Sequence, residues 1–176
     1  MLSSAFDLGE QMTLRLLSYT LYPPLWQKYA LPNVDLSFSK WNSIKYLNDN
    51  GNDFNADINT VPNNTGGLYL FYIKCNIMPG ITEFPFYIGR AQYTDGQNIR
   101  KRVKEYFSKF SKDDERPKIT KMFKYWGENL YLAYLTLNDN DDVKDFEKKL
   151  INSLLLPMND EIPDIEIRQA VKAFNL

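Results

Sequence analysis

Three strand-like runs place the strongest limit on how this chain can fold. They are residues 68–73 (LYLFYI), 84–88 (FPFYI) and 130–137 (LYLAYLTL), each rich in the aromatic and aliphatic residues that strands favour. MPGITE, between the first two runs, indicates a hairpin connection, and the breaker Gly127 precedes the third run. We therefore expect a small three-stranded antiparallel sheet.

Two amphipathic helices are expected to frame the third strand, because apolar residues recur there at helical spacing. The stripe of the first helix contains Ile99, Val103, Tyr106, Phe107 and Phe110, and that of the second contains Val143, Phe146, Leu150, Ile151 and Leu154. Pro157 ends the second helix. The order strand, strand, helix, strand, helix predicts an α+β fold whose sheet is flanked by helices.

Residues 1–60 differ from this pattern and are expected to form an N-terminal, mainly helical accessory extension. A helix is predicted from Phe6 to about Tyr22, where Pro23-Pro24 should stop it. Aromatic-rich irregular sequence follows, and then the Asn- and Asp-rich loop NDNGNDFNADIN. A length of 176 residues allows one core with an elaboration. The compact domain is accordingly placed at residues 61–176.

The chain contains no histidine and a single cysteine, Cys75, which restricts its possible chemistry. Histidine-dependent dyads, a histidine general base, histidine-ligated or multi-cysteine zinc and an internal disulfide are excluded within one chain. Catalysis would have to use Tyr, Lys, Arg, Asp or Glu. No apolar run is long enough to span a bilayer, and the first residues, MLSSAFDLGEQ, carry two acids where a secretory signal carries basic residues. We expect a cytoplasmic protein without a membrane partner.

Charge is unevenly distributed, although 21 basic residues nearly balance 22 acidic ones. Between residues 98 and 124 there are four acids and ten basic residues, namely Arg100, Lys101, Arg102, Lys104, Lys109, Lys112, Arg116, Lys118, Lys121 and Lys124. From residue 138 onward, nine acids stand against five basic residues. The basic stretch can form a phosphate-binding surface or a solvated helix face. For nucleic-acid binding, the candidates are Arg100, Lys101, Lys104 and Lys109.

Two charged residues lie where apolar ones are expected. Glu147 falls within the apolar stripe, four residues after Val143 and four before Ile151. A buried carboxylate must meet a cation, bind a metal or open onto a cleft, and a salt bridge to a lysine is the structural interpretation. Arg102 lies at the edge of its helix's apolar face, where it either has a role in a site or extends to solvent.

Tyr69 and Tyr87 would ordinarily be strand residues, but each is paired with a glycine two positions away, Gly67 and Gly89. The triplets Gly67-Leu68-Tyr69 and Tyr87-Ile88-Gly89 resemble the signature of the GIY-YIG nuclease family. Arg90-Ala91, then IRKRVKEYF, and later FEKKLINSLLLPMN follow in the family's order and look like the nuclease half of the bacterial excision-repair incision protein. The resemblance covers residues 66–159. The insertions NIMPGITEFP and YTDGQ depart from it as longer loops, which folds tolerate.

The resemblance implies a GIY-YIG-like fold and a metal-dependent DNA endonuclease. Its implied catalytic residues are Tyr69, Tyr87, Arg90, Arg102, Tyr106, Glu147 and Asn159. Glu147 would bind one divalent ion, Mg²⁺ or Mn²⁺, and Tyr69 would be the general base if nearby cations lower its pKa. Arg102 and Arg90 would supply positive charge beside it, and Arg102 would hold the scissile phosphate. Tyr87 and Tyr106 would orient water or phosphate, while the role of Asn159 would be structural or catalytic.

Two other functions are compatible with the sequence. The chain could be a catalytically inactive nucleic-acid-binding module of the same fold, although an intact Glu147 argues against this. It could also be a protein-interaction adaptor that docks through its aromatic N-terminal region. The form of DNA, the biological role and the oligomeric state stay open, with a dimer suited to cutting both strands.

Overall fold

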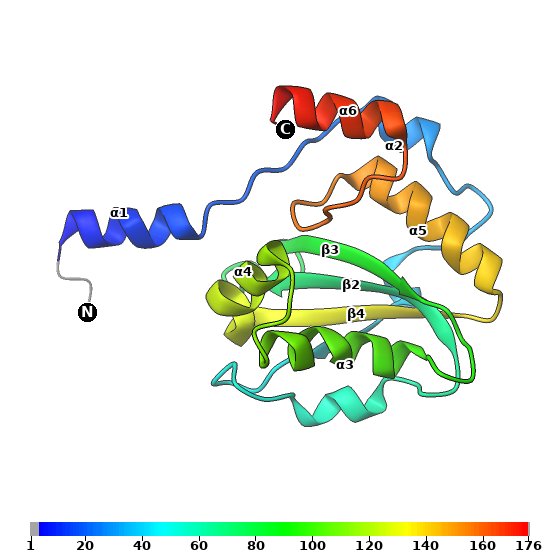
Figure 1. The fold of residues 1–176 in the computed structure, drawn as a ribbon, viewed down its shortest axis with the longest axis horizontal. Helices are drawn as coiled ribbons and strands as arrows, with labels where there is room; N and C mark the ends of the chain where they lie inside the picture. The colour runs from blue at the N-terminus through cyan, green and yellow to red at the C-terminus, as the bar shows by residue number, and fades with distance from the viewer. Residues whose placement is uncertain (1–3, 176) are drawn as a thin grey trace.

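The computed structural model describes residues 4–175, which fold around one antiparallel sheet of four strands (Figure 1). The strands are β1 (Asn42–Lys45), β2 (Gly66–Lys74), β3 (Glu83–Ala91) and β4 (Leu130–Leu137), in the spatial order β1-β4-β2-β3. The expected α+β class is confirmed, but the expected number of strands is wrong. The fourth strand, β1, pairs with β4, and its four residues are too few to produce a clear alternating pattern.

The helices flank the sheet as expected, and three of them were not predicted. Six α-helices lie within the described residues: α1 (Ala5–Leu14), α2 (Pro23–Lys28), α3 (Ile99–Phe110), α4 (Pro117–Trp126), α5 (Asn140–Leu154) and α6 (Ile165–Phe174). Three short 3₁₀ turns are η1 (Phe38–Lys40), η2 (Ala56–Thr60) and η3 (Gly127–Asn129). The two helices predicted from apolar periodicity correspond to α3 and α5, whereas α2, α4 and α6 are additional.

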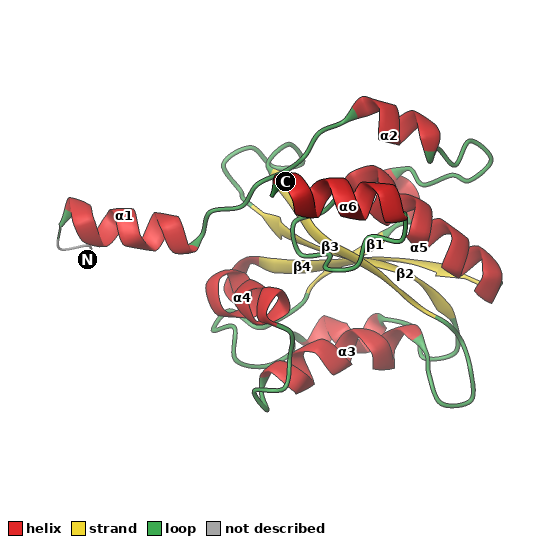
Figure 2. Ribbon diagram, turned by 45° about the horizontal axis from the view of Figure 1, so that its top comes forward, coloured by secondary structure: helices red, strands yellow, loops and turns green. Residues whose placement is uncertain are grey.

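The sheet separates two packed layers (Figure 2). On one face, Tyr69 and Phe71 of β2 belong to the main core, which includes residues of α3 and α4. Their neighbour Leu70 packs on the opposite face with Ile88 of β3 and Ile151 of α5. This alternation matters for the site, because consecutive residues of β2 and β3 face different layers.

The N-terminal helix is shorter than expected. Helix α1 ends at Leu14 instead of continuing to Tyr22, and it stands apart from the rest of the fold in Figure 1. Pro23 and Pro24 begin α2 rather than end a helix. The reason is that the first turn of a helix has unpaired N–H groups in any case, so proline loses nothing there.

Residues just before position 61 take part in the central fold. Tyr46, Leu47, Ile58 and Val61 are buried in the same core as β2, and the Tyr46 hydroxyl donates a hydrogen bond to the Val103 carbonyl. The division at residue 60 remains a prediction about folding units. Within residues 4–175, no helix has the length and apolar character needed to cross a membrane.

Candidate active site

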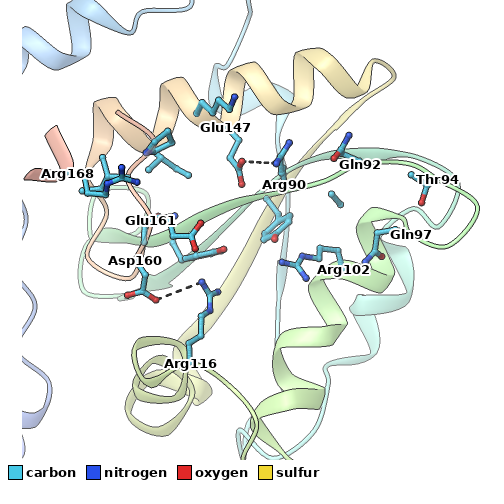
Figure 3. A pocket seen from close by; sticks show the side chains of 18 residues that line it. Arg90, Gln92, Thr94, Gln97, Arg102, Arg116, Glu147, Asp160, Glu161 and Arg168 are labelled. Atoms are coloured by element: carbon cyan, nitrogen blue, oxygen red, sulfur yellow. Dashed lines mark ion pairs between the residues drawn. The ribbon is translucent and has the colours of Figure 1, made fainter. Parts of the chain in front are cut away.

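A cleft of about 730 Å³ opens at the β3 edge of the sheet. Because β3 is an edge strand, side chains from both faces of the sheet can reach the same space around it. Figure 3 shows Glu147 entering from α5, Arg102 from α3 and Arg90 from β3. Six of the seven residues expected to be catalytic line the cleft, namely Tyr69, Tyr87, Arg90, Arg102, Glu147 and Asn159.

The seventh residue, Tyr106, joins two of the others from behind. Its hydroxyl lies 2.7 Å from the Tyr69 hydroxyl and 3.0 Å from the Tyr87 hydroxyl, within hydrogen-bonding distance of both. All three side chains are buried, and they come from α3, β2 and β3 respectively. Residues far apart in sequence therefore form one connected group of hydroxyls at the cleft.

The glycine of the second triplet makes room for this group, and the glycine of the first allows close approach to β4. Gly89 lies directly opposite Tyr69 in the pairing of β2 with β3. A Cβ atom on Gly89 would lie 2.6 Å from the Tyr69 hydroxyl oxygen and 2.7 Å from its ring carbon Cζ. Gly67, with φ +153°, would place a Cβ atom 2.1 Å from the Leu135 carbonyl oxygen. The spacing of glycine and tyrosine is thus a steric requirement of this sheet.

A methyl group at Gly89 should therefore damage the site. Because the Gly89→Ala variant must displace the Tyr69 ring or shift β3, we expect a loss of about 1–3 kcal/mol in the free energy of unfolding. Denaturant unfolding would measure it. Gly96→Ala is the matched control, because no atom lies within 4 Å of a Cβ built there. Equal stability of the two variants would contradict the steric account.

The pKa values of two of these tyrosines move in the opposite direction from the one that general-base catalysis needs. Burial is the main cause that raises the pKa of Tyr69, and the nearby Tyr87 raises it further. The positive charge of Arg102 offsets only part of this rise. Burial also raises the pKa of Tyr106 well above its ordinary value. The general-base role of Tyr69 requires a lowered pKa, whereas burial raises it. Both groups are neutral phenols near pH 7.

Raised tyrosine pKa values make stability depend on alkaline pH. Above about pH 10 the unfolded chain releases phenolic protons that the folded chain keeps, so the free energy of unfolding falls as pH rises. Each such group contributes up to about 1.4 kcal/mol per pH unit. Denaturant unfolding between about pH 8 and 11 should show this fall, with a shallower slope in Tyr106→Phe. An unchanged slope in that variant would show that Tyr106 does not titrate differently on folding.

Arg102 is held in place by two neighbours, Tyr106 and Glu105. Its guanidinium carbon lies 5.2 Å from the centre of the Tyr106 ring, and its Nη1 atom lies 2.8 Å from Oε2 of Glu105. The other Glu105 oxygen accepts a hydrogen bond of 2.9 Å from the Gln97 amide. The side chain lines the cleft beside the tyrosines, so its charge is directed to the site.

Glu147 meets a cation, and that cation is Arg90. Nε of Arg90 lies 2.8 Å from Oε2 of Glu147, whose side chain is 17% exposed. Burial raises the pKa of Glu147, while Arg90 and Arg102 act to lower it. The structural interpretation of Glu147 named a lysine as its partner, which is wrong. Arg90 was also expected beside Tyr69, but it pairs with Leu68 in the sheet and so faces the α5 layer.

Asn159 continues the sheet beyond its edge strand. Its side-chain oxygen accepts a hydrogen bond of 3.1 Å from the Ile88 N–H, and its side-chain nitrogen donates one of 2.8 Å to the Ile88 carbonyl. The Met158 N–H donates to the Phe86 carbonyl in the same manner. Asn159 thus occupies the exposed hydrogen-bonding groups of β3 and fixes the segment after α5 against the cleft. Its geometry favours the structural role.

The proposed nucleic-acid-binding residues lie outside the cleft lining. Lys101 and Lys109 are exposed on α3, and Lys104 lies over the Phe54 ring. The Arg100 guanidinium is occupied, because it donates to the backbone carbonyls of Asn59 and Val61. Arg100 therefore fastens α3 to the segment before β2, and its assignment to DNA binding stays a prediction.

Sequence reasoning did not assign several charged residues to the site that line the cleft, namely Arg116, Lys148, Asp160, Glu161 and Arg168, although it counted Arg116 within the basic stretch. Arg116 precedes α4, a helix that was not predicted. The available signal was Arg116-Pro117 followed by Ile119, Met122, Phe123 and Trp126 at helical spacing. Asp160 and Glu161 directly follow Asn159, which places them at the cleft once Asn159 pairs with β3.

The acidic residues of the cleft are compatible with a magnesium-like ion. Within residues 4–175, no group of three or more His, Cys, Asp or Glu side chains is arranged to hold a metal. Mg²⁺, however, usually keeps several waters and needs only one or two carboxylates in addition to phosphate oxygens. Glu147 supplies one, and Glu161 is close enough to raise the pKa of Glu147 by charge repulsion. These donors fit a hydrated divalent ion.

Comparison of the chain with protein-family models, with curated proteins and with solved structures finds no match in any of the three. The functional argument therefore starts from the geometry of the cleft.

Proposed function

We propose that the chain is a metal-dependent DNA endonuclease of the GIY-YIG type, which hydrolyses a phosphodiester bond in the cleft at the β3 edge. One observation carries the proposal: Tyr69, Tyr87, Arg102 and Glu147, the residues that the sequence resemblance selects, line a single cleft. They come from β2, β3, α3 and α5, so their convergence depends on the whole fold.

The side chains can supply most of what phosphodiester hydrolysis requires. The planar fork of Arg102 can bind two phosphoryl oxygens and neutralise charge that develops on them. Because Tyr69 is a neutral phenol, we assign it with Tyr87 and Tyr106 to hydrogen bonds that orient the attacking water and a phosphate oxygen. These hydroxyls are already positioned by their mutual hydrogen bonds, which reduces the reorganisation needed during reaction.

Glu147 would hold the divalent ion, and the adjacent carboxylate of Glu161 would reinforce the negative potential there. When bound, such an ion neutralises phosphoryl charge and lowers the pKa of a coordinated water. Before the ion binds, Glu147 is paired with Arg90. Arg90 therefore has the position of a counter-ion that keeps the carboxylate deprotonated and oriented.

The same ion pair also favours the alternative of a DNA-binding module without turnover. If Arg90 occupies Glu147 permanently, the carboxylate has no free site for a metal, and the cationic groups of the cleft would bind phosphate without cutting it. This alternative predicts that DNA binding is unaffected by divalent ions.

The adaptor alternative has its own feature. Helix α1 stands apart from the sheet, and Phe6 and Met12 on it are largely exposed. Large exposed apolar side chains are typical of protein–protein contacts. In that case Glu147 would have no effect on function.

Binding and cleavage assays with labelled duplex, branched and single-stranded DNA distinguish the nuclease from both alternatives. Binding is first measured in EDTA, and Mg²⁺ or Mn²⁺ is then added. The proposal predicts binding in EDTA and strand cleavage after metal addition. Binding with no cleavage of any of the three DNAs would favour the inactive module, and neither binding nor cleavage would favour the adaptor.

A further inference from the structure

Arg116 is a second arginine beside the tyrosine group, placed there by a part of the chain with no counterpart in the sequence signature. It is the residue before α4 and lines the cleft together with Tyr87 and Arg102. Its guanidinium carbon lies 5.6 Å from the centre of the Tyr87 ring, much as Arg102 lies 5.2 Å from that of Tyr106. In the linked hydroxyl group of Tyr69, Tyr106 and Tyr87, one arginine therefore lies over the ring of the central tyrosine, Tyr106, and another over the ring of Tyr87.

Asp160, the acidic partner of Arg116 across the cleft, holds it only loosely. Nη1 of Arg116 lies 3.8 Å from Asp160 and Nε lies 3.4 Å from Glu115. Figure 3 shows Arg116 reaching up from the start of α4 towards Asp160 on the opposite side of the cleft. The Arg116 and Asp160 side chains are 42% and 33% exposed, and an ion pair of this length and exposure is weak. Asp160 also has a second cation, because Lys118 Nζ lies 3.4 Å from its other oxygen.

A phosphate group could therefore displace Asp160 from Arg116 at little cost. The phosphate would offer oxygens that match the planar guanidinium, whereas Asp160 does not reach hydrogen-bonding distance of it. Asp160 would remain neutralised by Lys118 after the exchange. The cleft thus provides Arg116 as the phosphate-binding group and Lys118 as the remaining partner of the displaced Asp160.

We propose that Arg116 is a phosphate-binding residue of this cleft, which releases Asp160 and contacts the DNA backbone next to the phosphate held by Arg102. The inference rests on the proposed function, because it takes DNA as the ligand of the cleft. It adds a binding group from α4 and assigns Asp160 as the competitor for that group.

The test measures the affinity of a short fluorescent DNA duplex, and of the single strand of the same sequence, in EDTA over a range of salt concentrations. Arg116→Ala should weaken binding roughly tenfold at low salt and reduce the salt slope by about one, as expected for one lost phosphate contact. Asp160→Asn should tighten binding, because Arg116 no longer has to leave a carboxylate. Lys112→Ala is the matched control, because Lys112 is an exposed cation of the same basic stretch that does not line the cleft.

The double variant Arg116→Ala/Asp160→Asn separates this contact from general charge effects. If Asp160 acts by occupying Arg116, its removal should have no effect once Arg116 is absent. The inference would be overturned if Arg116→Ala leaves the salt slope of DNA binding unchanged. It would also be overturned if Asp160→Asn raises DNA affinity equally in the native protein and in Arg116→Ala. If the native protein cuts DNA but Arg116→Ala has the same salt slope as the native protein, only the inference about Arg116 is refuted. Native protein that binds DNA through Arg116 but never cuts it would refute only the nuclease.

Discussion

The Glu147→Gln variant is expected to cleave DNA about a thousandfold more slowly while it still binds DNA. The reason is that an ion that stabilises the transition state by several kcal/mol would lose its protein ligand. The amide keeps nearly the same shape, so neighbouring residues such as Ile151 and Val143 can pack as before. It removes the negative charge that attracts a cation and that pairs with Arg90. The loss should therefore appear in kcat rather than in DNA affinity.

The matched control for Glu147 is Asp145→Asn on the same helix. Asp145 is exposed and pairs with Lys149 outside the cleft, so this variant removes one negative charge from α5 without touching the site. Cleavage by Asp145→Asn should stay close to the native rate. Thermal unfolding of both variants checks that each is folded. If Glu147→Gln cuts DNA as fast as Asp145→Asn, Glu147 is not a metal ligand and the ion pair with Arg90 is only structural.

The Arg102→Lys variant is expected to reduce cleavage by about a hundredfold, although the charge at this position is preserved. Lysine cannot present two parallel N–H groups to a phosphate, and it cannot reproduce the planar contact with Tyr106 or the ion pair with Glu105 in the same geometry. Most of the loss should appear in kcat, because a fork that fits the developing phosphoryl charge stabilises the transition state more than bound DNA.

The control for Arg102 is Lys101→Ala, which removes a neighbouring cation from the exposed side of α3. It should weaken DNA binding slightly at low salt and leave kcat unchanged. Arg102→Lys with native kcat would mean that only charge is needed at this position. In that case the proposed two-oxygen contact with phosphate is incorrect.

Sequence reasoning was most successful where a residue type conflicts with its surroundings. Glu147 lies within an apolar stripe, and the structure places it at a cleft and beside a cation, as such a residue requires. The glycine of the second triplet is likewise explained, because Gly89 lies opposite Tyr69 in the sheet and a Cβ atom there would meet the Tyr69 side chain. Local pattern was enough in these cases because the constraint acts on one helix or one pair of strands.

The remaining features depend on contacts that the sequence pattern does not contain. Arg90 follows the Tyr87-Ile88-Gly89 triplet in sequence, yet it faces the opposite layer from Tyr69. The pKa of Tyr69 depends on how deeply the ring is buried, and burial outweighs the charge of Arg102. Arg116 reaches the cleft only because α4 packs on α3, a tertiary contact between helices of which only α3 was predicted.

Nicking of supercoiled plasmid by the native protein tests the central claim most directly. The rate is followed with Mg²⁺, after addition of excess EDTA, and after Mg²⁺ is restored, with Glu147→Gln purified in parallel. The account predicts nicking that stops in EDTA, resumes with Mg²⁺ and is lost in the variant. Nicking at the same rate in EDTA or in Glu147→Gln, or none with Mg²⁺ or Mn²⁺, would contradict it.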